Sequence, residues 1–236
     1  MVNPEVLRLV AADQKRWSLT GNELKTSIAS ARWSVFVLAV SGAIFATWGA
    51  QIHVHHPSRA QVFGYLGAAS LALVAVIRQW KLGPTRIQSW IFARSASEAL
   101  NREIYPYRTA TGPYSGTSPE DTLLNRREEI LANVRSVQDE RVELKVEVDV
   151  PGQLDANGYL QERIDGPNGQ LQFYTSRAQQ SSNMQGRLQG IEFFLALLGA
   201  LLGAALTITG KQAYGAWVAV ITTISGSLAA TYRTTL

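Results

Sequence analysis

Two uncharged runs near the C-terminal end constrain this chain more than any other feature of it. They cover Phe193–Gly210 and Gln212–Tyr232, and Lys211 alone separates them. Each run is about 20 residues long, which is the length of helix that crosses the hydrocarbon of a bilayer. Because the connection is so short, we expect the two runs to form an antiparallel helical hairpin in a membrane.

A similar pair of uncharged runs lies near the N-terminus, at residues 33–52 and 60–77. The mean hydropathy of the whole chain, −0.01, conceals this alternation of apolar and charged segments. The predicted fold class is an all-α membrane protein with four transmembrane helices in two hairpins (spans 33–52, 60–77, 191–210 and 212–232).

The placement of positive charge predicts the orientation of these spans. Of the 22 Lys and Arg residues, only Arg59 and Lys211 fall in the two hairpin loops. Since positive residues near span ends stay on the cytoplasmic side, the N-terminus, the middle region and the C-terminus should be cytoplasmic. We expect a multi-pass protein of the inner cell membrane, with both hairpins in the same orientation. Acidic residues are interleaved with the basic ones, which favours solvated helix faces over nucleic-acid binding.

Apolar residues at spacings of three, four and seven predict a cytoplasmic layer of amphipathic helices. These helices should cover residues 5–32, 84–104, 119–137 and 155–187, with a turn at 166–169 in the last. Their apolar stripes, in chain order, are Val6, Val10, Trp17, Leu24 and Ile28; Trp90, Ala93, Ala96 and Leu100; Leu123, Ile130, Val134 and Val137; Leu171, Tyr174, Ala178 and Leu188. Gly21 is expected to weaken or bend the first helix, and Ser118 to cap the third before Pro119.

Residues 142–150 depart from the helical pattern, because apolar and charged residues alternate there with the period of a strand. The segment either pairs with its own copy across subunits or is an extended linker. Around it, the unit of a cytoplasmic helix followed by a two-span hairpin occurs twice, which predicts domains at residues 1–140 and 141–236. Both copies begin inside, unlike the inverted repeats of many transporters.

Two stretches carry a resemblance to a known family. The first follows the first hairpin and contains Trp90, Arg94, Ser97-Glu98, Leu100, Tyr105, Tyr107 and Gly112-Pro113-Tyr114. The second leads into the second hairpin and contains Tyr159, Arg163-Ile164-Asp165, Gln172-Phe173-Tyr174 and Arg177-Ala178. Together they resemble the SLATT family in its tandem form, whose two-span effector domains associate with nucleotide-second-messenger and SLOG-type sensors in prokaryotes.

The resemblance implies a pore-forming or membrane-perturbing effector that is held silent until a sensor or a nucleotide signal releases it. It also implies a partner at the cytoplasmic helices, either a sensor protein or a component of nucleotide signalling. The sequence departs from the family pattern in two places. The turn at 166–169 interrupts what is one helix in relatives, and relatives continue past the position of Leu236.

Hydroxyl side chains in the fourth span are the candidates for lining a pore. Thr222, Ser225 and Ala229 fall on one face of the predicted helix. Small and hydroxylated side chains on one face either line a narrow aqueous path or allow close helix packing. No ionisable residue lies within the core of any predicted span, which disfavours a pump or an ion-coupled transporter.

In the third span, Ala196, Gly199 and Gly203 form a pattern of small residues that predicts helix packing. Gly64 and Ser41-Gly42 suggest the same for the first hairpin. These positions are interpreted as structural.

The loop after the first span contains His53, His55 and His56. Imidazoles at this density bind zinc, nickel or copper when a fourth ligand is present, but no carboxylate is nearby in sequence, which favours a polar loop. The chain has no cysteine, and no P-loop, nucleophile elbow or metalloprotease helix is found. We therefore expect no enzymatic activity, no metal and no cofactor.

These features favour a pore-forming effector or ion channel that is gated through its cytoplasmic helices and linked to prokaryotic nucleotide-signalled defence. Four short spans are too few to surround a pore by themselves, so a pore requires a homo-oligomer. Because homo-oligomers usually have closed symmetry, we expect a cyclic arrangement. The alternative is a sealed membrane scaffold, or a protein that docks a sensor, with no conduction.

Overall fold

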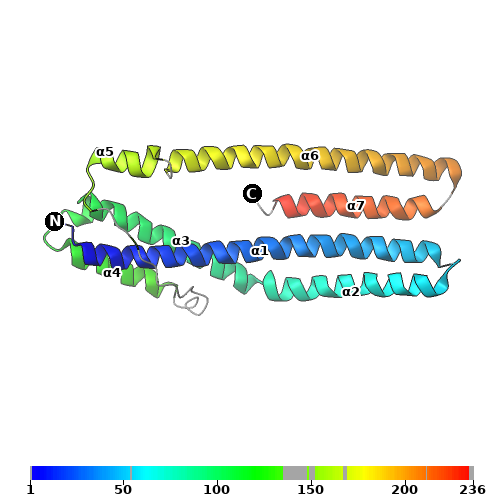
Figure 1. The fold of residues 1–236 in the computed structure, drawn as a ribbon, viewed down its shortest axis with the longest axis horizontal. Helices are drawn as coiled ribbons and strands as arrows, with labels where there is room; N and C mark the ends of the chain where they lie inside the picture. The colour runs from blue at the N-terminus through cyan, green and yellow to red at the C-terminus, as the bar shows by residue number, and fades with distance from the viewer. Residues whose placement is uncertain are drawn as a thin grey trace. The chain divides into compact units, whose positions relative to one another are not determined.

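The computed structural model describes residues 2–53, 55–134, 148, 152–166, 169–210 and 212–233, without the side chains of 212–213 and 227–233. Every regular element in these residues is a helix, as predicted. In chain order the elements are α1 (Pro4–Ile52), α2 (Pro57–Lys81), α3 (Pro84–Arg108), η1 (Gly112–Tyr114), α4 (Pro119–Ala132), α5 (Ala156–Tyr159), η3 (Leu160–Asp165), α6 (Gln170–Thr209) and α7 (Gln212–Arg233) (Figure 1).

Three helical runs are long and apolar enough to cross a membrane. They lie in α1, in α2 and in the run Ala156–Thr209, which contains α6. The described apolar stretch of α7, Tyr214–Gly226, is shorter. The chain is therefore a helical membrane protein, and the count of four spans remains a prediction.

The chain packs as two compact units. The first unit comprises residues 1–28 and 84–176, and the second comprises residues 29–83 and 177–236. Helices α1 and α6 each contribute residues to both units. This division follows packing, whereas the predicted domains at 1–140 and 141–236 follow the repeat in the sequence.

The core of the first unit is built from the predicted stripes of three helices. Its buried members include Val10, Trp17 and Leu24 of α1, Ala93, Ala96 and Leu100 of α3, and Leu123 of α4. Val134, which follows the end of α4, is buried as well. These three stripes are confirmed at the described positions, and Val137 lies outside them. The helical periodicity predicted the buried residues of these helices correctly, because each helix has one wide apolar face and a partner helix within the same chain.

Gly21 lies where α1 crosses α3. A methyl group built on it would be 3.7 Å from the backbone nitrogen of Arg94, in ordinary van der Waals contact. The helix runs unbroken through this position, so the glycine does not interrupt it. Burial of the surrounding stripe outweighs the helix propensity lost at one glycine, which is about 1 kcal/mol.

Two helix ends differ from the prediction. Helix α3 continues through Pro106 to Arg108 instead of ending at 104. A proline removes one backbone hydrogen bond and crowds the preceding turn, but Pro106 lies in the last turn, where Tyr107 and Arg108 are buried. Helix α4 ends at Ala132 rather than at 137, and its Ser118 makes no side-chain capping hydrogen bond, although Pro119 occupies the first helical turn as expected.

The segment before α6 folds as the predicted short helix. The side chain of Asp155 caps α5 by accepting a hydrogen bond from the backbone N–H of Gly158 at 2.7 Å. A π-helical turn, η3, extends the segment to Asp165, and α6 begins at Gln170. The predicted turn at 166–169 therefore falls between two helices, with residues 167–168 outside the described part. The alternating segment 142–150 also lies outside it, apart from Val148.

In the second unit, the apolar half of α1 packs closely along α2. A methyl group on Gly42 would be 3.3 Å from the carbonyl oxygen of Gly67, and one on Gly49 would be 3.1 Å from that of Ala60. Since the later residue of α1 meets the earlier residue of α2, the helices run antiparallel. Of the predicted packing residues, Gly42 lies at the contact. The backbone nitrogen of Gly64 also lies there, 3.4 Å from a methyl group on Gly49, although a methyl group on Gly64 itself would meet nothing within 4 Å.

Helices α6 and α7 pack less closely. A methyl group on Gly199 would be 3.6 Å from the side chain of Ile221, and one on Gly215 would be 3.4 Å from that of Leu206. An edge-to-face contact between Trp48 and Trp217, with ring centroids 6.3 Å apart, joins the two helix pairs.

Candidate ligand pocket beside the Arg108–Glu162 ion pair

A pocket of about 780 Å³ lies in the first unit, between the C-terminal part of α3 and the segment Leu154–Arg163. Helix α3 and the turn after it contribute Asn101, Arg102, Tyr105, Pro106, Thr109 and Thr111, and the segment contributes Leu154, Asp155, Ala156, Tyr159, Leu160 and Arg163. The two walls of the pocket come from segments that lie far apart in the sequence.

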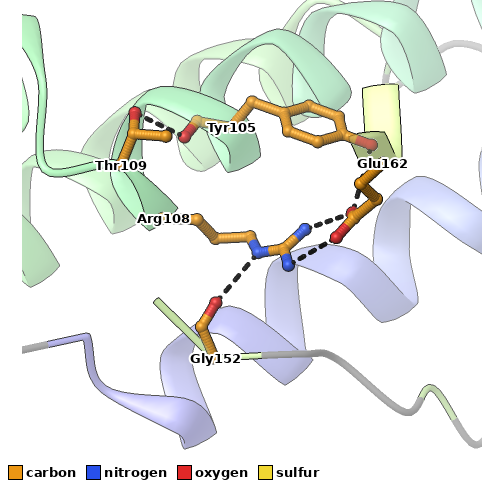
Figure 2. A network of polar contacts seen from close by, with 5 residues as sticks. All are labelled: Tyr105, Arg108, Thr109, Gly152 and Glu162. Carbon is orange, nitrogen blue, oxygen red and sulfur yellow. Dashed lines mark hydrogen bonds and ion pairs between the residues drawn. The ribbon is translucent and has the colours of Figure 1, made fainter. Parts of the chain in front are cut away.

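An ion pair fixes these two walls to each other (Figure 2). Two guanidinium nitrogens of Arg108 donate to the two carboxylate oxygens of Glu162, at 2.5 and 2.9 Å. The third nitrogen donates to the carbonyl oxygen of Gly152 at 3.1 Å. The Arg108 side chain is 3% exposed and that of Glu162 is 36% exposed. Such a bidentate pair is directional as well as strong, so it holds η3 in a defined orientation on α3.

The ion pair also sets the charges around the pocket. Hydrogen bonding from Arg108 lowers the pKa of Glu162, against an opposing effect of burial. Burial raises the pKa of Tyr105, and the negative charge of Glu162 raises it further. The phenol is therefore protonated at neutral pH, and it donates to Glu162 over 3.4 Å. The carboxylate is ionised and compensated by Arg108.

Aromatic rings and guanidinium groups line the pocket together. The rings of Tyr105 and Tyr159 meet edge to face, with centroids 5.6 Å apart. The guanidinium carbon of Arg163 lies 4.9 Å from the centre of the Tyr105 ring, within the range of a cation–π interaction. The aromatic and guanidinium side chains of both walls therefore pack against one another.

Other buried polar groups of this unit form hydrogen bonds that connect one helix to another. Asp13 of α1 is buried and accepts two hydrogen bonds from the guanidinium of Arg127 of α4, at 2.8 and 2.5 Å. Tyr114 donates to Glu103 at 2.5 Å, and burial, followed by this bond, raises the pKa of Tyr114. These contacts fix the orientation of the helices relative to one another.

The structure places the predicted pore-lining residues on α7. The hydroxyl of Thr222 donates to the carbonyl oxygen of Val218 in its own helix at 2.9 Å, and Thr222 is exposed. Ser225 is half-buried, and the side chain of Ala229 lies outside the described part. Their role in lining a path remains a prediction.

The predicted packing residues of α6 do not all meet a neighbour. Gly199 faces Ile221 of α7, whereas a methyl group on Gly203 would meet nothing within 4 Å. Ala196 is exposed. Only one position of the pattern therefore contacts α7 within this chain, and the packing role of the other two stays a prediction.

The three histidines lie around the turn between α1 and α2. His53 lines a shallow hollow there with Gly49 and Ala60, while His55 and His56 are exposed. The described residues contain no group of three or more His, Cys, Asp or Glu side chains placed to hold a metal ion.

The ion pair and the pocket were missed by reasoning from the sequence. Arg108 and Glu162 are 54 positions apart, and each looks like an ordinary surface charge. Tyr105, Tyr159 and Arg163 did stand among the residues of the family resemblance, but nothing in their spacing indicated that they meet.

Two regions of this helical membrane protein match known families. Residues 159–234 match the SMODS and SLOG-associating 2TM effector domain 1. Residues 15–122 match the family DUF4231, which is described as a protein of unknown function. It is a related family of the two-transmembrane type. The resemblance to the SLATT family is confirmed over residues 159–234. No curated protein and no solved structure matches the chain.

Proposed function

We propose that this protein is a membrane effector that conducts ions or small solutes once its cytoplasmic helices release the spans. The match of residues 159–234 to an effector domain carries the proposal. The hydroxyl side chains of α7 and the absence of ionisable residues from the span cores support a neutral wetted path. The family description supports a role in prokaryotic defence and a cytoplasmic partner that is a sensor or a component of nucleotide signalling.

The proposed arrangement has four spans in two hairpins of the same orientation, with both termini and the middle region in the cytoplasm. A cyclic homo-oligomer would surround the path. Helix α6 supports this assembly, because none of its residues is buried within the chain. An exposed apolar helix of this length is covered either by lipid or by another subunit.

Ion flux from liposomes that contain the purified full-length protein tests the proposal. We expect flux through the wild type, and a loss of about tenfold or more when both Thr222 and Ser225 are replaced by Leu. Thr207→Leu is the matched control, because it changes a hydroxyl residue of the third span. Liposomes that stay tight to small ions with the wild type, in the presence and absence of candidate nucleotides, would contradict conduction.

A sealed scaffold or sensor-docking protein is the second candidate. Close packing of α1 on α2 favours it, since Gly42, Gly49 and Gly67 let the backbones of these helices approach each other closely. It predicts that the Thr222 and Ser225 replacements leave the cellular activity unchanged, whereas changes in the pocket of the first unit abolish it. A cell-growth assay with both sets of variants separates the two functions.

A further inference from the structure

The pocket beside the ion pair has the size of a site for a small molecule. Its volume of about 780 Å³ lies within the range of about 300–1,000 Å³ that is usual for ligand sites. Its lining combines apolar surface, to which Pro106, Leu154 and Leu160 contribute, with polar and charged side chains. Such a mixture is typical of sites that bind one small ligand in one orientation.

The charged side chains of the lining favour an anion. Arg102 and Arg163 both line the pocket, and among the described residues neither forms an ion pair. Arg108, by contrast, is compensated by Glu162. The one carboxylate of the lining, Asp155, is already an acceptor for the N–H of Gly158. The pocket therefore carries a surplus of positive charge in the form that best binds phosphate and carboxylate groups.

The aromatic side chains favour a ligand with a flat ring. Tyr159 and Tyr105 stand perpendicular to each other in the wall, and Arg163 is stacked over Tyr105. A planar ring can therefore stack on a tyrosine while its anionic group reaches a guanidinium. Asn101 and the hydroxyls of Thr109 and Thr111, which are 2.9 Å apart, add hydrogen-bonding groups at the rim.

We propose that this pocket binds a small anion that carries a flat aromatic ring, with Arg102 and Arg163 holding the anionic group and Tyr159 the ring. A nucleoside phosphate and an aromatic carboxylate both combine an anionic group with a flat aromatic ring, so either class fits the pocket. A ligand there contacts α3 and the segment that leads into α6 at once, so it reinforces the connection made by Arg108 and Glu162. Binding is independent of conduction, and it goes beyond the proposed function.

Calorimetric titration of the full-length protein in detergent tests the proposal with four probes: adenosine monophosphate, adenosine, inorganic phosphate and indole-3-acetate. We expect adenosine monophosphate or indole-3-acetate, or both, to bind at least about tenfold more tightly than adenosine and phosphate, a difference of about 1.4 kcal/mol. A preference for the nucleotide identifies a nucleoside phosphate, and a preference for the indole acid identifies an aromatic carboxylate. Phosphate that binds as tightly as both would overturn the role of the ring.

Variants locate the site. Arg102→Gln and Arg163→Gln should each weaken binding about tenfold or more, and Tyr159→Leu should weaken binding of the aromatic probes while leaving that of phosphate unchanged. Arg126→Gln on the exposed face of α4 is the matched control and should change nothing. Arg102 is exposed, so its variant keeps the test valid if the others unfold. Lack of binding by both aromatic anions at about 1 mM, or binding that Arg102→Gln leaves unchanged, would refute the proposal.

Discussion

Helices α1 and α6 have the same plan but different surroundings. Each begins with an amphipathic stretch and continues into an apolar one. The stripe of α1 is buried, with Trp17 at 0% exposure, because α3 and α4 cover it. The stripe of α6 is not, since Leu171 is 60% and Tyr174 is 64% exposed. The same sequence pattern thus produces a finished core along α1 and an open face along α6, although both stretches belong to the first unit.

The largest expected effect concerns the buried side of this comparison. Trp17→Ala should destabilise the protein by about 3–5 kcal/mol, because the change removes a large side chain from a packed core. Thermal unfolding of the full-length protein in detergent measures the effect. Trp17→Phe is the control and should cost much less, since it keeps a ring and removes an indole N–H that finds no hydrogen-bond partner among the described residues.

Next in size is the ion pair that fixes the segment before α6. Arg108→Met should cost about 1–2 kcal/mol at neutral pH, a value reduced here because Glu162 is partly exposed. The folded pKa of Glu162 is lowered from its ordinary 4.5. Its contribution is therefore complete above that value and is lost as the pH falls through the lower folded pKa.

The wild type should accordingly lose its advantage over Arg108→Met on acidification below about pH 4. Thermal unfolding of both proteins across this range gives the difference. Arg126→Met, which breaks an exposed pair with Glu129, should show no measurable change at any pH. A difference between wild type and Arg108→Met that grows in acid would be inconsistent with this role of Glu162.

A comparable effect on stability separates the two apolar helix pairs. Gly67→Ala should cost about 1–2 kcal/mol, because its methyl group would be 3.2 Å from the backbone oxygen of Gly42 in α1. Gly203→Ala in α6 should be neutral or slightly stabilising, since its methyl group would meet nothing within 4 Å. The midpoint of thermal unfolding in detergent compares the two. Equal losses would show that α6 is packed as tightly as α2.

The smallest effect on stability is expected at the open stripe. Leu171→Ser should change the unfolding free energy by less than about 0.5 kcal/mol, as for other surface positions, but it should weaken self-association if a second copy covers this face. Light scattering of the detergent complex reports the subunit number. Gln172→Ser, on the neighbouring face of α6, is the matched control and should affect neither quantity.

Much of the fold could be predicted because its signals are local. Trp17, Leu100 and Leu123 occur at helical spacing, and the energy of burying them depends on little beyond that spacing and a partner helix. Glycine contacts were harder to predict. Gly67 and Gly49 meet their partners through backbone atoms, and their role depends on how α1 and α2 are rotated about their axes, which apolar sequence alone leaves undefined.

The pocket could not be predicted at all, and the reason is geometric. Arg108 and Glu162 look like solvated charges because each has polar neighbours in sequence. Their pairing depends on where the segment Leu154–Arg163 returns to α3, and no local propensity encodes that return. The tyrosines and arginines of the two walls line one pocket only when that segment packs against α3.

The sequence by itself determined that this chain is helical, that it enters a membrane and that its amphipathic helices have apolar faces. These properties follow from run length, charge and period, which act over one or two helical turns. Tertiary structure decided which faces are covered, which glycines touch and where a pocket opens beside Arg108. Those outcomes depend on contacts between distant residues, whose free energy exists only when the helices have come together.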